Sequence, residues 1–165
     1  MNLLAVDPGL RVCGIAYYAD DALSVCVLVR NPEREARGPM AWMALAEQVR
    51  KVLPNWCKPD AVVLEVPQVY VIGKGKGDPA DLIELAGVDG AIAAQYPDAK
   101  HFGFRPREWK GSVPKDVHHA RVLKTLSETD KRLVEESAPA SLRHNVLDAV
   151  ALGAWFLRKQ RSILD

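Results

Sequence analysis

Apolar residues in the N-terminal part of the chain come in short runs separated by turn residues. Leu3–Val6 leads through Asp7 into Pro8–Gly9, where proline presets φ and glycine can adopt the conformation that reverses the chain. Apolar and β-branched residues resume over 11–18 and again over 22–29. This pattern predicts three strands in an antiparallel meander.

Two later segments have the apolar spacing of helices. Over 39–53, apolar residues recur at helical spacing and charged residues fill the opposite face, which predicts an amphipathic helix with Trp42 and Met43 in the core. A second helix is expected over 79–95, because Asp78 is a good N-cap and a proline follows it. Small residues on one side of this helix permit close packing against a sheet or against a second copy of the chain.

The remaining apolar runs predict two strands and two helices. Ala61–Leu64 is a continuous apolar run, typical of a strand buried on both faces, and 100–104 is a further short strand. Helices are expected over 114–126, with its apolar residues in the core, and over 142–160, where apolar residues occur on most sides. The polar segment 127–141 contains a proline, and no element is predicted there.

The order of these elements predicts an α/β fold in which helices are layered on a sheet. At 165 residues the chain fits one domain, long enough to bury a sizeable core without disulfides. The three cysteines have no CxxC or histidine-paired spacing, which indicates reduced thiols. No segment resembles a signal peptide or a membrane span. We therefore expect a cytoplasmic protein with no membrane partner.

The net charge of +1 does not by itself indicate nucleic-acid binding, but the distribution of the cations is more informative. Clustered cations can create a local binding field that the net charge hides. Two loop-like stretches hold Lys74, Lys76, Arg105, Arg107, Lys110 and Lys115. The Gly-Lys stretch 73–77 can approach phosphates closely, or it is a solvated loop; it lacks the hydroxyl residue of a Walker motif.

Three isolated acidic residues stand in unusual settings. Asp7 and Glu65 each end a run predicted to be a buried strand, and Asp148 lies inside the apolar C-terminal helix. Such acids are candidate metal ligands or catalytic bases. Each also has a structural explanation: a turn cap, a strand-end surface carboxylate, or a charge that favours the N-terminus of a helix.

The three acids converge if the first and fourth strands pair in parallel and the last helix crosses the same end of the sheet. Carboxylates brought together without paired arginines repel one another, and divalent cations relieve that repulsion. Hard oxygen ligands select Mg²⁺ or Mn²⁺. The sequence therefore predicts a metal site formed by Asp7, Glu65 and Asp148.

The motifs around these acids resemble those of the RuvC family of Holliday junction resolvases, in the ribonuclease H-like superfamily. The matching segments are Ala5–Leu10, Leu64–Glu65 followed by Tyr70, and Asp148–Leu152, in the family's order over nearly the whole chain. The resemblance implies a single nuclease domain over 1–165 with a ribonuclease H-like fold. Its mixed five-stranded sheet would combine a three-strand antiparallel meander with two parallel strands, flanked by helices.

The resemblance also implies an active site with two metal ions and a homodimer that cuts four-way DNA junctions. Asp7, Glu65 and Asp148 would hold Mg²⁺ or Mn²⁺, with Asp7 between the ions. The family usually has an acid or a histidine three residues before the last aspartate, where this chain has Asn145. Asn145 is the positional equivalent and should weaken the second ion, and His144, one residue out of register, is the alternative ligand.

Other residues gain DNA-binding roles from the resemblance. Lys110 and Lys115 are expected near the scissile phosphate and the junction backbone. Tyr70 matches an aromatic residue that stacks on junction bases, although it could instead pack on the core. A two-fold symmetric junction needs two active sites related by a dyad, and the small-residue side of 79–95 is the expected dimer interface.

Other functions remain compatible with the same residues. The acids would also serve a nuclease acting on structured RNA or on RNA–DNA hybrids. A chain in which Asn145 abolishes binding of the second metal would bind junctions without cutting them. A sugar-kinase-like ATPase needs two such domains, for which 165 residues are too few. The stretch 73–77 and Tyr70 favour junction DNA, cut by two-metal phosphodiester hydrolysis.

Overall fold

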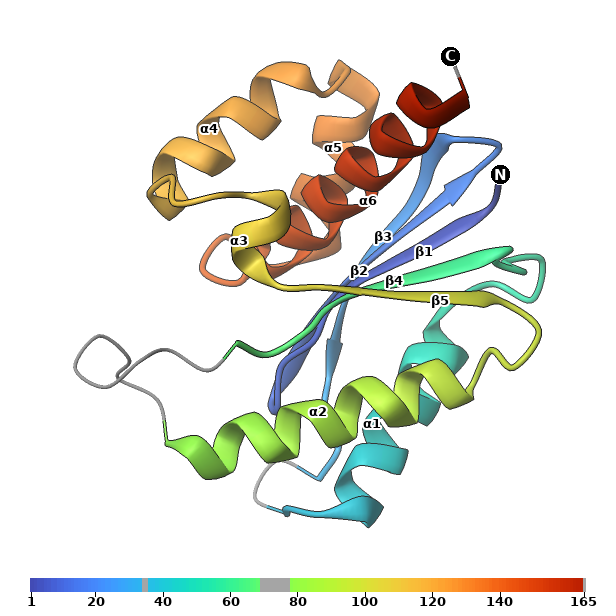
Figure 1. The fold of residues 1–165 in the computed structure, drawn as a ribbon, viewed down its shortest axis with the longest axis vertical. Helices are drawn as coiled ribbons and strands as arrows, with labels where there is room; N and C mark the ends of the chain where they lie inside the picture. Colours follow the sequence, from blue (N-terminus) through green and yellow to red (C-terminus); the bar gives the residue numbers. More distant parts are fainter. Residues whose placement is uncertain (34–35, 69–77, 165) are drawn as a thin grey trace.

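The computed structural model describes residues 1–33, 36–68 and 78–164. Its strands are β1 Leu3–Asp7, β2 Val12–Ala19, β3 Ala22–Arg30, β4 Ala61–Glu65 and β5 Lys100–Phe104. They form one sheet in the order β3-β2-β1-β4-β5 (Figure 1). The β1–β2 and β2–β3 pairs are antiparallel, whereas the β1–β4 and β4–β5 pairs are parallel. The predicted meander, the two parallel strands and the α/β fold class are confirmed.

Helices cover both faces of this sheet. They are α1 Pro39–Val52, α2 Pro79–Ala94, α3 Pro106–Trp109, α4 Lys115–Thr125, α5 Glu128–Ser137 and α6 Arg143–Leu164. α1 and α2 lie on one face, and α3 to α6 lie on the other (Figure 1). Within the described ranges, no helix is both long enough and apolar enough to cross a membrane.

Two apolar cores lie on the two faces, because successive residues of a strand point to opposite sides of a sheet. Leu3 and Ala5 belong to the core beneath α6, whereas Leu4 and Val6 belong to the core beneath α1 and α2. All four side chains are fully buried. β1 is therefore apolar along its whole length up to Asp7, the residue at which it ends.

Two glycines allow α6 to lie close to the sheet. A Cβ added to Gly14 of β2 would overlap the backbone oxygen of Asn145, and one added to Gly153 of α6 would overlap the ring of Tyr18. Across the same interface, Tyr18 Oη donates a 2.6 Å hydrogen bond to the carbonyl oxygen of Val150. These contacts fix the first turns of α6 over the sheet, and with them the acid that α6 carries.

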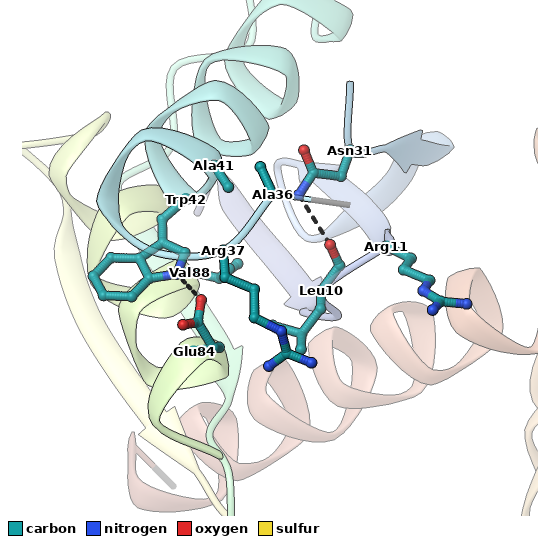
Figure 2. A pocket seen from close by; sticks show the side chains of 9 residues that line it. All are labelled: Leu10, Arg11, Asn31, Ala36, Arg37, Ala41, Trp42, Glu84 and Val88. Carbon is teal, nitrogen blue, oxygen red and sulfur yellow. Dashed lines mark hydrogen bonds between the residues drawn. The ribbon is translucent and has the colours of Figure 1, made fainter. Parts of the chain in front are cut away.

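A tryptophan–glycine contact joins α1 to α2. Trp42 lies against Gly87, where a Cβ would overlap the indole ring, and its Nε1 donates a 2.6 Å hydrogen bond to Glu84 Oε2 (Figure 2). Trp42 packs against the core as predicted. The same prediction is wrong for Met43, which is 59% exposed, because the next position along a helix points about 100° away.

The outer helices depart from the sequence prediction in two ways. The polar stretch 127–141 contains α5, which begins at a capping box formed by Ser127 and Asp130. α4 forms where it is predicted, but it has no buried residue, and Val117 and Leu123 are exposed. α4 lies in an outer layer against α6 and not on the sheet, so few of its apolar positions reach the core.

We predict that Gly14→Ala lowers the free energy of unfolding by about 3 kcal/mol, because the new methyl group must displace the backbone of α6. Gly90→Ala is the matched control, since a Cβ there meets no atom within 4 Å. The control should raise stability by about 0.5–1 kcal/mol through helix propensity. Urea denaturation measures both, and equal effects of the two substitutions would contradict the close approach of β2 and α6.

Candidate active site

The topology brings three acids to one end of the sheet. β1 and β4 are parallel neighbours with Val6 opposite Leu64, so the residues that end them, Asp7 and Glu65, lie at the same edge. Asp148 sits in the second turn of α6 and is only 2% exposed. The three acids are near enough to one another that the charges of Asp148 and Glu65 act on the pKa of Asp7.

Asp7 is the acid without a local partner. No side chain or backbone group in the described ranges forms a hydrogen bond or an ion pair with its carboxylate. Burial raises the pKa of Asp7 well above its usual value, and the negative charges of Asp148 and Glu65 raise it further. Lys110 and Lys115 lower the pKa of Asp7 but do not offset these effects. The negative charge of Asp7 is therefore unfavourable, and binding of a proton or of a cation would relieve it.

Glu65 is held by the end of α3 and the residue after it. Trp109 Nε1 donates a 2.8 Å hydrogen bond to Glu65 Oε2, and Lys110 Nζ lies 2.9 Å from the same oxygen. The negative charges of Glu65, Asp148 and Asp7 keep the pKa of Lys110 above its usual value although burial opposes its charge. Lys110 is therefore a fixed ammonium group beside all three acids.

Asp148 is held from α4. Lys115 Nζ lies 3.0 Å from its Oδ2, and His119 Nε2 lies 2.9 Å from its Oδ1. Burial alone would raise the pKa of Asp148, but the His119 hydrogen bond and the charges of Lys110 and Lys115 lower it below the usual value. The pKa of Asp148 is therefore shifted in the direction opposite to that of Asp7.

Neither expected fourth ligand, Asn145 nor His144, forms a side-chain hydrogen bond or an ion pair with Asp7, Glu65 or Asp148. Asn145 Nδ2 donates a 3.1 Å hydrogen bond to the carbonyl oxygen of Leu142 in its own helix turn. His144 is partly buried, and this burial and the charge of Lys115 lower its pKa, although Asp148 acts in the opposite sense. The choice between Asn145 and His144 as a ligand stays open.

The basic residues singled out in the sequence separate into three groups. Lys110 and Lys115 lie in the site, in ion pairs with Glu65 and Asp148. Arg105 pairs with Glu108 at 3.3 Å, and Arg107 is an exposed residue of α3. Tyr70, Lys74 and Lys76 lie outside the described residues, and their DNA-binding roles stay predictions.

Two titratable residues near the site were not singled out in the sequence. His119 lies four residues after Lys115, so the two share one face of α4, a spacing that is visible in the sequence. Asp89 of α2 is 7% exposed, and neither of its carboxylate oxygens has a hydrogen-bond partner in the described part of the chain. Burial, with a smaller effect of Glu65, raises the pKa of Asp89 to about 8. An acid between apolar helix positions is the signal that could have identified it.

Carboxylate oxygens are suitable ligands for a divalent cation, but in this structure the acids are not close enough together to hold one. Across 1–33, 36–68 and 78–164, no three acidic, histidine or cysteine side chains are grouped closely enough to hold a metal ion. Two of the carboxylates are instead paired with Lys110 and Lys115. Asp7 remains unpaired beside them, and a cation ligated by carboxylate oxygens would remove the repulsion that raises its pKa.

We predict that Asp7→Asn stabilises the metal-free protein at neutral pH by about 0.5–2 kcal/mol, because it removes a partly buried charge that Asp148 and Glu65 repel. The pKa of Asp7 is raised on folding, so ionised Asp7 destabilises the fold increasingly as the pH rises above the unfolded-state pKa. The gain should therefore shrink as the pH falls towards 4. Urea denaturation in EDTA at several pH values measures it, and a gain that is constant with pH would refute this explanation.

Known structures share the fold that surrounds this site. No protein-family model matches the sequence, and no curated protein matches it either. T. thermophilus RuvC in complex with a Holliday junction substrate is similar, with a TM-score of 0.71 and 19% identity over 98% of this chain and 96% of that one. A second Thermus thermophilus RuvC structure has a TM-score of 0.65 and 18% identity, with 97% of each chain covered.

A eukaryotic structure is also similar. The yeast mitochondrial Holliday junction resolvase Ydc2 has a TM-score of 0.66 and 12% identity over 96% of this chain and 78% of that one. All three similarities extend over nearly the whole of this chain. The chain therefore has the RuvC-type, ribonuclease H-like fold of Holliday junction resolvases.

Proposed function

We propose that this protein is a structure-selective endonuclease that resolves four-way DNA junctions in recombination, repair or phage DNA processing. The observation that carries the proposal is the meeting of Asp7, Glu65 and Asp148 at one end of the sheet, with Lys110 and Lys115 beside them. The fold shared with resolvases, one of them bound to a Holliday junction, supports the same activity. We further propose that residues 1–165 form a single nuclease domain that acts in the cytoplasm.

Asp7, Glu65 and Asp148 are the residues proposed to hold two Mg²⁺ or Mn²⁺ ions, with Asn145 or His144 completing the set. When bound, such ions lower the pKa of the attacking water and stabilise the leaving 3′ oxygen of the phosphodiester. The charges of both Asp148 and Glu65 act on Asp7, so its carboxylate is the one proposed to contribute to both ions. His119 orients Asp148 through its 2.9 Å hydrogen bond and is a positioning residue.

The two lysines are proposed to exchange partners when DNA binds. Lys110 and Lys115 now neutralise Glu65 and Asp148, from ammonium groups 2.9 and 3.0 Å away. If cations take over this neutralisation, the lysines are released to contact the scissile phosphate and the junction backbone. Arg105, Arg107 and the stretch 73–77 extend the proposed DNA contacts, with Tyr70 stacking on a base.

A homodimer would place two such sites about a dyad, as paired incisions of a symmetric junction require. The small-residue side of α2 is not wholly free for this contact, because Gly87 is covered by Trp42. Exposed apolar side chains on the same layer are the better candidates: Ile83 of α2 is 70% exposed, and Met40 and Met43 of α1 are 77% and 59% exposed. We propose that these three residues form the dimer contact.

Cleavage assays with Asp7→Asn test the proposed activity. The parent protein should make paired incisions in a synthetic four-way junction in Mg²⁺ or Mn²⁺, and Asp7→Asn should lower the rate at least about 100-fold, because one proposed bridging carboxylate is lost. Asp116→Asn, an exposed acid at the start of α4, is the matched control and should cleave at the parental rate.

The substrate panel for this assay also contains RNA–DNA hybrid, structured RNA and linear duplex. If the protein cleaves structured RNA or RNA–DNA hybrid faster than the junction, RNA or hybrid is its substrate and the junction is not. Junction binding without cleavage in either metal, with activity appearing in Asn145→Asp, would establish a binding protein. An Asp7→Asn variant as active as the parent would refute the assigned site.

Sedimentation velocity with Ile83→Asp tests the dimer. The parent should sediment as a dimer at micromolar concentration, and the substitution should give a monomer with unchanged circular dichroism, because a charge would be buried at the contact. Leu123→Asp, an apolar-to-acidic change on α4 at a side chain that is 39% exposed, is the control and should leave the dimer intact. A parent that remains monomeric would contradict the proposal.

A further inference from the structure

A cavity of about 180 Å³ lies between α4 and α6, and Trp109, which donates a hydrogen bond to Glu65, forms part of its wall. The residues that matter for its chemistry are Trp109, His118, Arg121, Trp155 and Arg158. Two indole rings and two guanidinium groups around one cavity form a combination that binds planar rings next to negative charge. None of these residues except Trp109 has a role in the acid group described above.

Both indole rings are held in place before any ligand arrives. Trp109 donates its hydrogen bond to Glu65, lies edge-on to the His118 ring at 5.2 Å, and has Lys110 Nζ 4.9 Å from its ring centroid. Trp155 lies edge-on to the ring of Phe104, 4.9 Å away. Because both rings are already fixed, their side chains lose little conformational entropy when a ligand stacks on them.

The polar groups of the cavity lack partners. Arg121 and Arg158 are exposed, and neither forms an ion pair or a hydrogen bond with another described residue. His118 Nε2 is buried and has no hydrogen-bond partner in the same ranges. The two arginines favour an anionic ligand, and the His118 ring nitrogen favours a ligand that can form a hydrogen bond with it. A purely apolar ligand would satisfy neither.

We propose that this cavity binds one unpaired nucleobase of the DNA, with Arg121 and Arg158 contacting its flanking phosphates. This inference rests on the proposed junction-resolving function. A nucleobase is planar and offers hydrogen-bonding edges to His118, and its backbone supplies the anions that the arginines lack. A free phosphate would use the arginines but not the indole rings.

The location of the cavity suits a base displaced during junction binding. Trp109 forms one wall and also holds Glu65, so the base would lie one side chain away from a proposed catalytic carboxylate. Bases at a crossover have incomplete stacking, which lowers the cost of extruding one of them. A captured base would fix which phosphodiester reaches Lys110 and the acids.

Abasic substitutions test whether a base is bound. Four-way junctions carry one abasic site in turn at each nucleotide around the crossover, and binding is measured by fluorescence anisotropy in EDTA so that no strand is cut. The affinity of the parent protein should fall about tenfold at one position and its symmetry mate, the size expected for one stacked base. An equal affinity for every abasic junction would overturn the proposal.

Substitutions in the cavity test where the base lies. Trp155→Leu should bind the intact junction about tenfold more weakly and should no longer distinguish the critical abasic junction from the intact one. Arg158→Ala, at an exposed position where folding is not at risk, should weaken binding and reduce its salt dependence. Arg132→Ala on α5 is the control for loss of one exposed charge and should keep the tenfold discrimination. Discrimination that survives in Trp155→Leu would place the base elsewhere.

Single-stranded DNA separates this proposal from the proposed function. If the parent does not bind junctions, a ten-nucleotide oligodeoxynucleotide and its abasic counterpart are titrated while tryptophan fluorescence is measured. Quenching by the base-containing strand alone, lost in Trp155→Leu, would retain the cavity as a nucleobase site while the junction-resolving function fails. No quenching by either strand would overturn the cavity proposal as well.

Discussion

Negative charge gathered at one end of the sheet, in one buried and two partly buried acids, is the constraint to which the surrounding structure responds. Parallel pairing of β1 and β4 forces Asp7 and Glu65 together, and close packing of α6 adds Asp148. Lys110 and Lys115 offset two of these charges, and His119 adds a hydrogen bond, but Asp7 keeps a raised pKa. Such a site lowers the stability of the fold, because an apolar residue at each of these positions would give a larger free energy of unfolding.

The sheet could be predicted because its signals are local. Continuous apolar runs ending in an acid or a turn define β1 and β4, and the Asp-Pro-Gly turn joins β1 to β2. The order of elements then leaves few ways to arrange them. Asp7, Glu65 and Asp148 could be singled out as candidate site residues for the same reason, since each interrupts or ends an apolar segment.

The α4–α5 region could not be predicted to the same degree. α5 is polar, and it is defined by a capping box and by Val134, its buried residue, and not by an apolar stripe. The contact of His119 with Asp148 joins residues 29 positions apart, on helices whose mutual packing no local pattern specifies. The cavity between Trp109 and Trp155 likewise arises only when α4 lies against α6.

The pairing of Lys110 and Lys115 with the acids has a consequence for how metal and substrate would influence each other. The ammonium groups now pair with Glu65 and Asp148, so a divalent cation bound by these carboxylates would have to compete with them for the same oxygens. A DNA phosphate that withdraws the lysines would remove this competition and raise the affinity for the cation. By thermodynamic reciprocity, the bound cation would raise the affinity for DNA by the same factor. Cation and DNA would then bind cooperatively, and the carboxylates would hold the cation most tightly when DNA is already bound.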